Sequence, residues 1–157
     1  SGFGRIRILA NDLIPKSQLN PEFNLEWVTK EEIYKEADLI SLHLPLTALT
    51  RNMIRHEQLL QMKKDAFIIN TSRGGIINEN DLYRIMIKGH LGGAAIDVFE
   101  NEPYKGKLVE IDRCILTAHM GSMSIDCRSK MEIEATEEAV RFLTGESLTQ
   151  EAPVNEY

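Results

Sequence analysis

The stretch AFIINTSRGG at residues 66–75 decides the fold class of this chain. Its first four residues are apolar and include two β-branched isoleucines, which favour a buried strand of a parallel sheet. Small polar residues and two glycines follow, and these favour a turn. Ligands bind at the carboxyl ends of strands in open α/β sheets. Arg73 lies at such an end, where its guanidinium could bind a carboxylate through two hydrogen bonds. The alternative is that Arg73 is a surface salt-bridge residue on a loop.

The rest of the chain alternates between strand-like and helix-like segments. We expect strands at residues 6–10, 25–28, 38–44, 66–69, 92–96 and 114–117, and helices after the capping box Thr29–Glu32 and at residues 56–62, 78–88 and 124–143. This alternation predicts an α/β fold with a mostly parallel sheet and helices on both faces. Apolar residues recur at helical spacing in the last helix, which predicts that one of its faces packs on a core.

Composition excludes several classes of function. The chain has 157 residues, 43% hydrophobic and 27% charged, as expected of about one globular domain. A net charge of −6 argues against nucleic acid and anionic membranes as partners, and no apolar run approaches the ~20 residues that span a bilayer. Cys114 and Cys127 form no paired motif and fit reduced thiols in a cytosolic protein. The histidines show no ligand spacing, so we expect no metal site.

Four of the expected strands end in polar or ionisable residues, namely Asp12, Arg73, Asp97 and His119. The carboxyl ends of parallel strands meet at one edge of a sheet, so we expect these four side chains on the same rim. The alternative for each is a solvated strand-end residue or a cap, and Asp12 fits it best because aspartate is common in turns.

The chemistry of this set suits hydride transfer coupled to proton transfer. His119 can exchange a proton near neutral pH, and Glu102 in the preceding loop could fold back to orient its ring. Arg73 could hold a substrate carboxylate, and Asp12 stands where an acid binds a ribose diol in nucleotide-binding units. Together they suggest reduction of a small 2-oxo acid.

The sequence also resembles the D-isomer-specific 2-hydroxyacid dehydrogenases, which include phosphoglycerate dehydrogenase, glyoxylate and hydroxypyruvate reductases and D-lactate dehydrogenase. The resemblance covers nearly the whole chain, in family order and spacing, through ADLISLHLPLT at 37–47, MK at 62–63, FIINTSRGG at 67–75, AIDVFENEP at 95–103 and TAHMG at 117–121.

The resemblance implies a Rossmann-like doubly wound fold and specific residue roles. The family's substrate-binding arginine falls on Arg73, its acid–base histidine on His119 and the glutamate paired with that histidine on Glu102. The resemblance assigns NAD contacts to Asp12, His43, Pro45, Thr71, Ser72, Asp97 and Gly121. An acid at Asp12 favours NAD over NADP, because it would repel a 2′-phosphate.

The chain departs from the family in important places. The family's Gly-x-Gly-x-x-Gly turn does not occur, and the text around Gly4 looks like the family sequence just before the second strand. We therefore expect residues 1–123 to be a partial NAD-binding domain that lacks the first βα unit. We expect residues 124–157 to be a helix and tail that return toward an absent substrate domain. Ala118 replaces a usual proline, and Met123 and Ser124 also depart from the family pattern.

These observations lead to one expected function and two alternatives. We expect the cofactor portion of an NAD-dependent, cytoplasmic D-2-hydroxyacid dehydrogenase, inactive as an isolated chain and homodimeric when complete, as members of the family commonly are. The alternatives are an NAD-sensing module of the corepressor kind, which the family also includes, and a degenerate inactive fragment. The identity of the 2-oxo acid is left open, because the upstream domain shapes that pocket.

Overall fold

The structure is a computed structural model, and it describes residues 6–18 and 24–149. Each predicted segment forms, with ends that differ from the expected ones by at most a few residues. The strands are β1 (Ile8–Ala10), β2 (Leu25–Trp27), β3 (Leu39–Leu42), β4 (Phe67–Asn70), β5 (Gly93–Ile96) and β6 (Cys114–Leu116). The helices are α1 (Lys30–Glu36), α2 (His56–Gln61), α3 (Glu79–Ile87) and α4 (Ile125–Thr144), with 3₁₀ turns η1 (Lys16–Gln18) and η2 (Lys107–Glu110).

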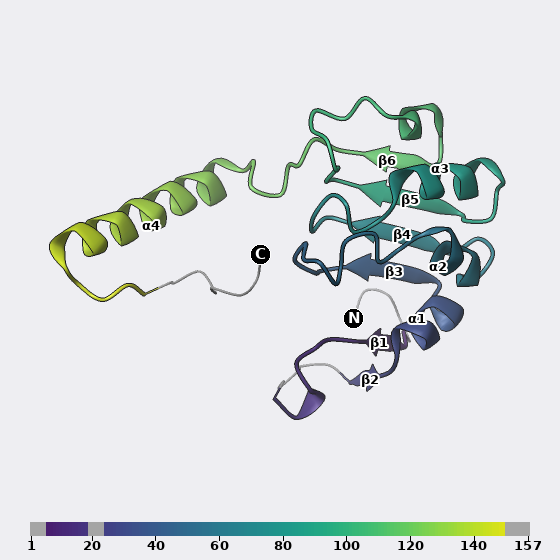
Figure 1. The fold of residues 1–157 in the computed structure, drawn as a ribbon, viewed down its shortest axis with the longest axis horizontal. Helices are drawn as coiled ribbons and strands as arrows, with labels where there is room; N and C mark the ends of the chain where they lie inside the picture. Colours follow the sequence, from purple (N-terminus) through teal and green to yellow (C-terminus); the bar gives the residue numbers. More distant parts are fainter. Residues whose placement is uncertain (1–5, 19–23, 150–157) are drawn as a thin grey trace.

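The strands form two parallel sheets instead of one. One sheet has the order β3-β4-β5-β6 and the other contains β1 and β2 (Figure 1). In the larger sheet Leu39 pairs with Phe67, and Phe67 in turn pairs with Gly93. The parallel α/β class predicted from the sequence is confirmed, because every strand pair is parallel and helices connect successive strands.

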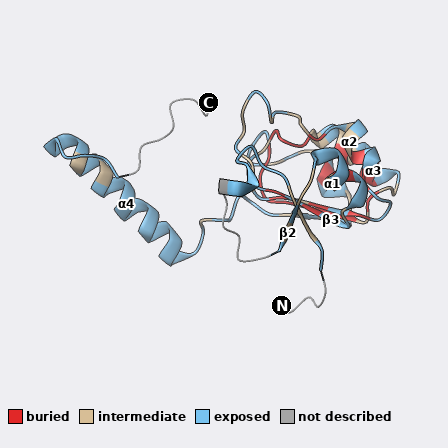
Figure 2. Ribbon diagram, turned by 90° about the horizontal axis from the view of Figure 1, so that it is seen from below, coloured by how far each residue is buried: buried red, intermediate tan, exposed pale blue. Residues whose placement is uncertain are grey.

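The described helices beside the sheet lie on one face only (Figure 2). The core between this face and the helices includes Ile40 and Ile68 from the sheet, Leu59 from α2 and Ile85 from α3. The opposite face exposes large apolar side chains: Leu39 is 54% exposed, Phe67 50% and Ile115 68%. Helices therefore cover one of the two faces in the described part of the chain, where the sequence predicted helices on both.

Local signals in the sequence account for the helix ends. Thr29 and Glu32 form the predicted capping box of α1, since each side chain bonds the backbone N–H of the other. Asn78 caps α3 by accepting the N–H of Asp81, and Gly89 follows the helix at φ +69°. These signals mark the start of the helix that connects β2 to β3 and both ends of the helix that connects β4 to β5.

Helix α4 extends away from the sheets (Figure 1). Ser124 caps its start, and Gly145 ends it in the left-handed conformation. None of its residues is buried, so the predicted packing of one helix face on a core is wrong for the described structure. The proposed boundary at residues 123 and 124 coincides with its start, although its role as a return to a second domain stays a prediction. None of the described helices is long and apolar enough to cross a bilayer.

Candidate active site

The loop after β4 is held by the buried side chain of Asn70. Its Oδ1 accepts hydrogen bonds from the N–H and the hydroxyl of Ser72, at 3.1 and 2.9 Å, and its Nδ2 donates to the carbonyl of Arg73 at 2.9 Å. The guanidinium of Arg73 donates to the carbonyl of Ser72 and forms no ion pair with a carboxylate of the described residues. This finding disfavours the alternative of a surface salt bridge, and Arg73 is an exposed residue.

A glycine at position 74 lets this loop touch the loop after β5. A Cβ added at Gly74 would lie 2.0 Å from the carbonyl carbon and oxygen of Phe99, so no side chain fits there. Gly75 has φ +79°, and its carbonyl accepts the N–H of Asn52 at 2.7 Å. The close approach at Gly74 thus brings Arg73 beside the segment that carries Glu102, while Gly75 ties the same loop to Asn52.

Asp97 ties the end of β5 to the loop after β6. Its carboxylate accepts the hydroxyl of Thr117 at 2.5 Å and the N–H of Met120 at 2.9 and 3.1 Å, while its carbonyl accepts the N–H of His119. Burial by itself raises the pKa of Asp97, but the hydrogen bonds from Thr117 and Met120, with His119 nearby, outweigh burial and hold that pKa below its usual value. Asp97 therefore acts as a charged brace under the His119 loop.

Glu102 and His119 form a carboxylate–imidazole pair. Nδ1 of His119 lies 3.1 Å from Oε2 of Glu102, while Oε1 of Glu102 accepts the N–H of Phe99 at 3.0 Å. The Phe99 N–H, and secondly His119, lower the pKa of Glu102 below its usual value. His119 has φ +53°, an uncommon conformation for a residue with a side chain. With Nδ1 directed at the carboxylate, Nε2 is the ring nitrogen left for a reacting molecule.

These loops line one hollow at the carboxyl end of the sheet. It is bordered by Leu46, Arg51, Arg73, Gly74, Phe99, Glu100, Glu102 and His119. The hollow thus brings together the three predicted catalytic residues Arg73, Glu102 and His119. Sequence reasoning missed Arg51, which pairs with Glu100 at 3.5 Å, and it also missed the bracing role of Asn70. Asn70 could have been found as a polar residue that ends an apolar strand.

The remaining predicted residues lie along the same ends of the strands but outside this hollow. Asp12 follows β1 in the other sheet, and its carboxylate accepts the N–H of Ile14 in a local turn. His43 follows β3, with Nε2 2.8 Å from the Ser41 hydroxyl, and the carbonyl of Pro45 accepts the Thr50 hydroxyl. Five of these predicted cofactor-binding residues are exposed, namely Asp12, His43, Pro45, Thr71 and Gly121.

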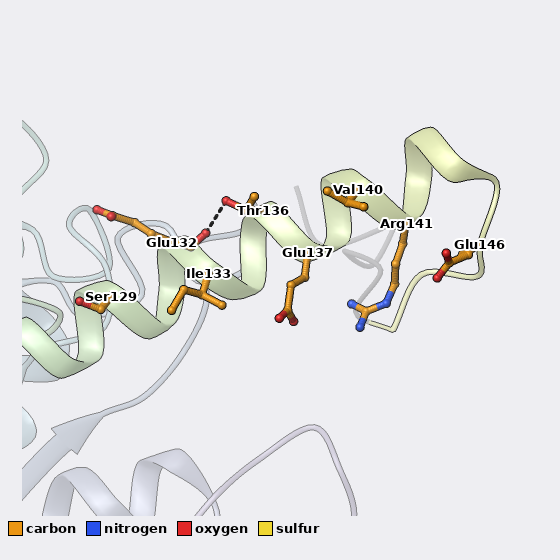
Figure 3. Close-up of a pocket in the computed structure, with 8 residues that line it drawn as sticks. All are labelled: Ser129, Glu132, Ile133, Thr136, Glu137, Val140, Arg141 and Glu146. Carbon is orange, nitrogen blue, oxygen red and sulfur yellow. Dashed lines mark hydrogen bonds between the residues drawn. The ribbon is translucent and has the colours of Figure 1, made fainter.

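A second hollow lies along α4 and is unrelated to this chemistry (Figure 3). Its lining residues are Ser129, Glu132, Ile133, Thr136, Glu137, Val140, Arg141 and Glu146. The hydroxyl of Thr136 donates to the carbonyl of Glu132 within the helix.

The described residues also contain no cluster of three or more His, Cys, Asp or Glu side chains able to hold a metal ion.

A parallel sheet with these polar groups at the carboxyl ends of its strands defines an α/β nucleotide-binding domain. The chain belongs to the D-isomer specific 2-hydroxyacid dehydrogenase family, because its residues 1–121 match the NAD-binding domain of that family.

Comparisons with individual proteins agree with this family. The chain is 39% identical to the glyoxylate reductase of Korarchaeum cryptofilum over 147 residues, which are 92% of this chain and 44% of that protein. It is 36% identical to the hydroxypyruvate reductase of Thermotoga maritima, over 90% of this chain and 51% of that protein. The holo structure of Rhodotorula graminis D-mandelate dehydrogenase matches with a TM-score of 0.84 and 29% identity, over 94% of this chain and 44% of that one. The chain thus spans about half the length of these relatives.

The donor set fits part of an NAD site. Asp12 offers an exposed carboxylate at the end of β1, where an acid suits the ribose hydroxyls. Thr71, beyond β4, adds an exposed hydroxyl at the same end of its sheet. A glycine-rich turn at a helix N-terminus, the usual cradle of a pyrophosphate, does not occur in the sequence. The residues present therefore fit hydroxyl groups of the cofactor better than its pyrophosphate.

Proposed function

We propose that this chain is the cofactor-binding part of an NAD-dependent oxidoreductase that interconverts a D-2-hydroxy acid and a 2-oxo acid. The observation that carries the proposal is the Glu102–His119 pair, with 3.1 Å between Oε2 and Nδ1, in one hollow with Arg73. A proton donor beside a permanent cation suits a molecule that has a reactive carbonyl next to a carboxylate.

Each of the three residues has a distinct role in this proposal. Arg73, which is exposed, binds the substrate carboxylate with its guanidinium. His119 gives a proton from Nε2 to the carbonyl oxygen during reduction and takes it back during oxidation. Glu102 holds the ring of His119 in place through Nδ1. When bound, the nicotinamide cofactor supplies or accepts the hydride.

The cofactor contacts follow from the same ends of the strands. Asp12 would bind the adenosine ribose, and its negative charge selects NAD over NADP. Asp97 would lie beside the nicotinamide, and His43, Pro45, Thr71, Ser72 and Gly121 would line the cleft between these ends. Because the carboxylate of Asp97 already accepts hydrogen bonds from Thr117 and Met120, its orientation is set before any ligand arrives.

Properties of the whole protein are part of the proposal as well. We infer a homodimeric cytoplasmic enzyme, supported by the family and by the two described cysteines, which are both free thiols. We also infer that the isolated chain is inactive, because it spans about half the length of its relatives. The comparisons give no support to an NAD-sensing corepressor role.

A chimera provides the test of the proposed function. This chain replaces the matching 44% of the Korarchaeum cryptofilum glyoxylate reductase, and NADH oxidation is followed by absorbance with glyoxylate and with hydroxypyruvate. We expect turnover, and we expect the His119→Ala chimera to lose at least about 100-fold in kcat. His56→Ala is the matched control, because the described structure gives the His56 ring no hydrogen bond or ion pair. Unchanged turnover in the His119→Ala chimera would contradict the proposal.

A further inference from the structure

Arg51 is a second cation on the wall of the hollow, and the proposed function gives it no role. It lies between β3 and α2, and its Nη1 is 3.5 Å from Oε1 of Glu100, which follows β5. The side chains of Arg51 and Glu100 are 52% and 54% exposed. The Arg51 guanidinium donates no hydrogen bond to the described residues, although a guanidinium carries several N–H donors. It therefore keeps its hydrogen-bonding capacity for another anion.

The turn at Gly75 positions Arg51 on this wall. The N–H of Asn52, the next residue, donates to the carbonyl of Gly75 at 2.7 Å. Nη1 of Arg51 lies 3.5 Å from the point where a Cβ of Gly75 would stand, and the methyl carbons of Leu46 lie 3.6 and 3.7 Å from the same point. Arg51 and Leu46 are thus neighbours beside the loop of Arg73, and all three residues border the hollow.

The ion pair between Arg51 and Glu100 is easy to separate. An ion pair between exposed side chains contributes little to stability. The backbone N–H of Glu100 donates to Oε1 of Glu79 at 2.8 Å, which brings a second carboxylate near that of Glu100. Burial raises the pKa of Glu79, the hydrogen bond from Glu100 lowers it, and the charge of Glu100 raises it again, so the two carboxylates repel each other. Glu100 can therefore turn into solvent at small cost when Arg51 binds another anion.

Each group on the carbonyl carbon of a 2-oxo acid meets a different part of the hollow. Under the proposed function, Arg73 binds the carboxylate and His119 reaches the carbonyl oxygen. The part of the wall that remains for the substrate side chain includes Leu46 and Arg51. Leu46 suits the methylene groups of such a side chain, and Arg51 suits an anion at its far end.

We propose that Arg51 is a specificity-determining residue that binds a second anionic group, a carboxylate or a phosphate, at the far end of the substrate side chain. The anion displaces Glu100 and accepts charge-assisted hydrogen bonds from the guanidinium. A substrate without this group leaves the pair of Arg51 and Glu100 intact and gains nothing from Arg51. The proposal rests on the proposed function, because Arg73 and His119 set the orientation of the substrate.

Ligand binding to the full chain tests this subsite without any turnover. The ligands are 2-oxoglutarate and 2-oxopentanoate, which differ only in that a methyl group replaces the distal carboxylate in the second. The Nε–Hε NMR resonances of the arginines report binding. We expect 2-oxoglutarate to shift the Arg51 resonance and to bind about tenfold more tightly than 2-oxopentanoate. 3-Phosphohydroxypyruvate and hydroxypyruvate are the corresponding pair for a phosphate, and the pair with the larger difference identifies the anion.

Variants assign the preference to Arg51. Arg51→Met keeps an unbranched side chain without the charge and should reduce the preference for 2-oxoglutarate to less than about twofold, whereas Arg51→Lys should restore part of it. Glu100→Gln removes the competing carboxylate and should tighten 2-oxoglutarate binding by about threefold or more. Arg84→Met is the matched control, because Arg84 forms an ion pair of the same length, 3.5 Å, with Asp81 outside the hollow. It should keep the wild-type preference.

Three results would overturn the proposal. The first is the same preference in wild type and Arg51→Met. The second is a Glu100→Gln chain that binds 2-oxoglutarate no more tightly than wild type. The third is an Arg51 resonance that neither 2-oxoglutarate nor 3-phosphohydroxypyruvate shifts.

Kinetics of the chimera separate this proposal from the proposed function. The ratio of kcat/KM for 2-oxoglutarate to kcat/KM for 2-oxopentanoate is measured with and without Arg51→Met. We expect the substitution to lower this ratio about tenfold, mainly through KM. An unchanged ratio in a chimera whose turnover depends on His119 would overturn the role of Arg51 and leave the proposed function supported. A lowered ratio in a chimera that His119→Ala does not impair would support Arg51 and contradict the proposed function.

Discussion

Glu102 and His119 are 17 residues apart in the chain, yet Oε2 of one lies 3.1 Å from Nδ1 of the other. The contact depends on two loops that follow neighbouring strands β5 and β6. Asp97 fixes the histidine loop by accepting the N–H of Met120, and the N–H of Phe99 fixes the other oxygen of Glu102. The pair is thus held from both sides by backbone groups rather than by the two side chains alone.

The pKa of Glu102 reports on this pair. In His119→Ala we expect the pKa of Glu102 to rise, because the imidazole no longer stabilises the carboxylate. It should stay below the usual glutamate value, since the Phe99 N–H is the larger cause of the lowering and remains in place. Carboxyl-carbon NMR titration measures the change, with His56→Ala as the control. A pKa of Glu102 that is the same in wild type and His119→Ala would contradict the contact.

Asp97 should make the stability of the fold depend on pH. Its pKa is lowered in the folded chain, so its stabilisation is complete above the unfolded value of about 3.9 and is lost as pH falls through the folded value. We expect Asp97→Asn to lower the free energy of unfolding at pH 7 by about 1–3 kcal/mol and to flatten its acid dependence. Urea unfolding between pH 2 and 7, a range of about five units that brackets both values, measures this.

Asp112 offers the matched control, because it is exposed and has no hydrogen bond in the described structure. We expect Asp112→Asn to change stability by less than about 0.5 kcal/mol. An Asp97→Asn protein as stable as Asp112→Asn at pH 7 would show that the brace under His119 contributes nothing.

The Asn70 side chain should determine the shape of the Arg73 loop. Asn70→Ala removes three hydrogen bonds and leaves the Ser72 N–H and the Arg73 carbonyl without their partner. We expect a loss of about 2–3 kcal/mol in the free energy of unfolding. Faster amide exchange at Ser72 and Arg73 should accompany it, and Thr71→Ala, at an exposed neighbour, should show neither effect.

The contact of Gly74 with Phe99 should not tolerate a side chain. A methyl group at position 74 would lie 2.0 Å from backbone atoms of Phe99, so the two loops must separate. We expect Gly74→Ala to lower stability by about 1–3 kcal/mol and to shift the amide resonance of Phe99, which donates to Glu102. Gly121→Ala is the control, because nothing lies within 4 Å of an added Cβ there. Similar stability of the two variants would argue against the close approach.

The sequence by itself determined the parallel α/β class, the segments that form its elements and the helix caps. Those features depend on residues that are neighbours along the chain. The apolar run that ends at Ile69 predicts a strand, the Thr29 hydroxyl near the Glu32 amide predicts the start of α1, and the glycine after α3 predicts the end of that helix. The polar residues at the strand ends could be predicted for the same reason, since a parallel sheet gathers those ends at one edge.

Only the tertiary structure decided how these parts come together. It split the strands into two sheets, left one sheet face and α4 uncovered, and showed that Asn70 and Asp97 brace the loops of Arg73 and His119. Some of these contacts join residues that lie far apart in the sequence, and others depend on the direction of a side chain. Neither kind of contact leaves a periodic pattern in the sequence. Residues 66–75 predicted a strand and a ligand-binding turn because those are local, but the position of Arg73 near Glu102 and His119 depends on packing between loops.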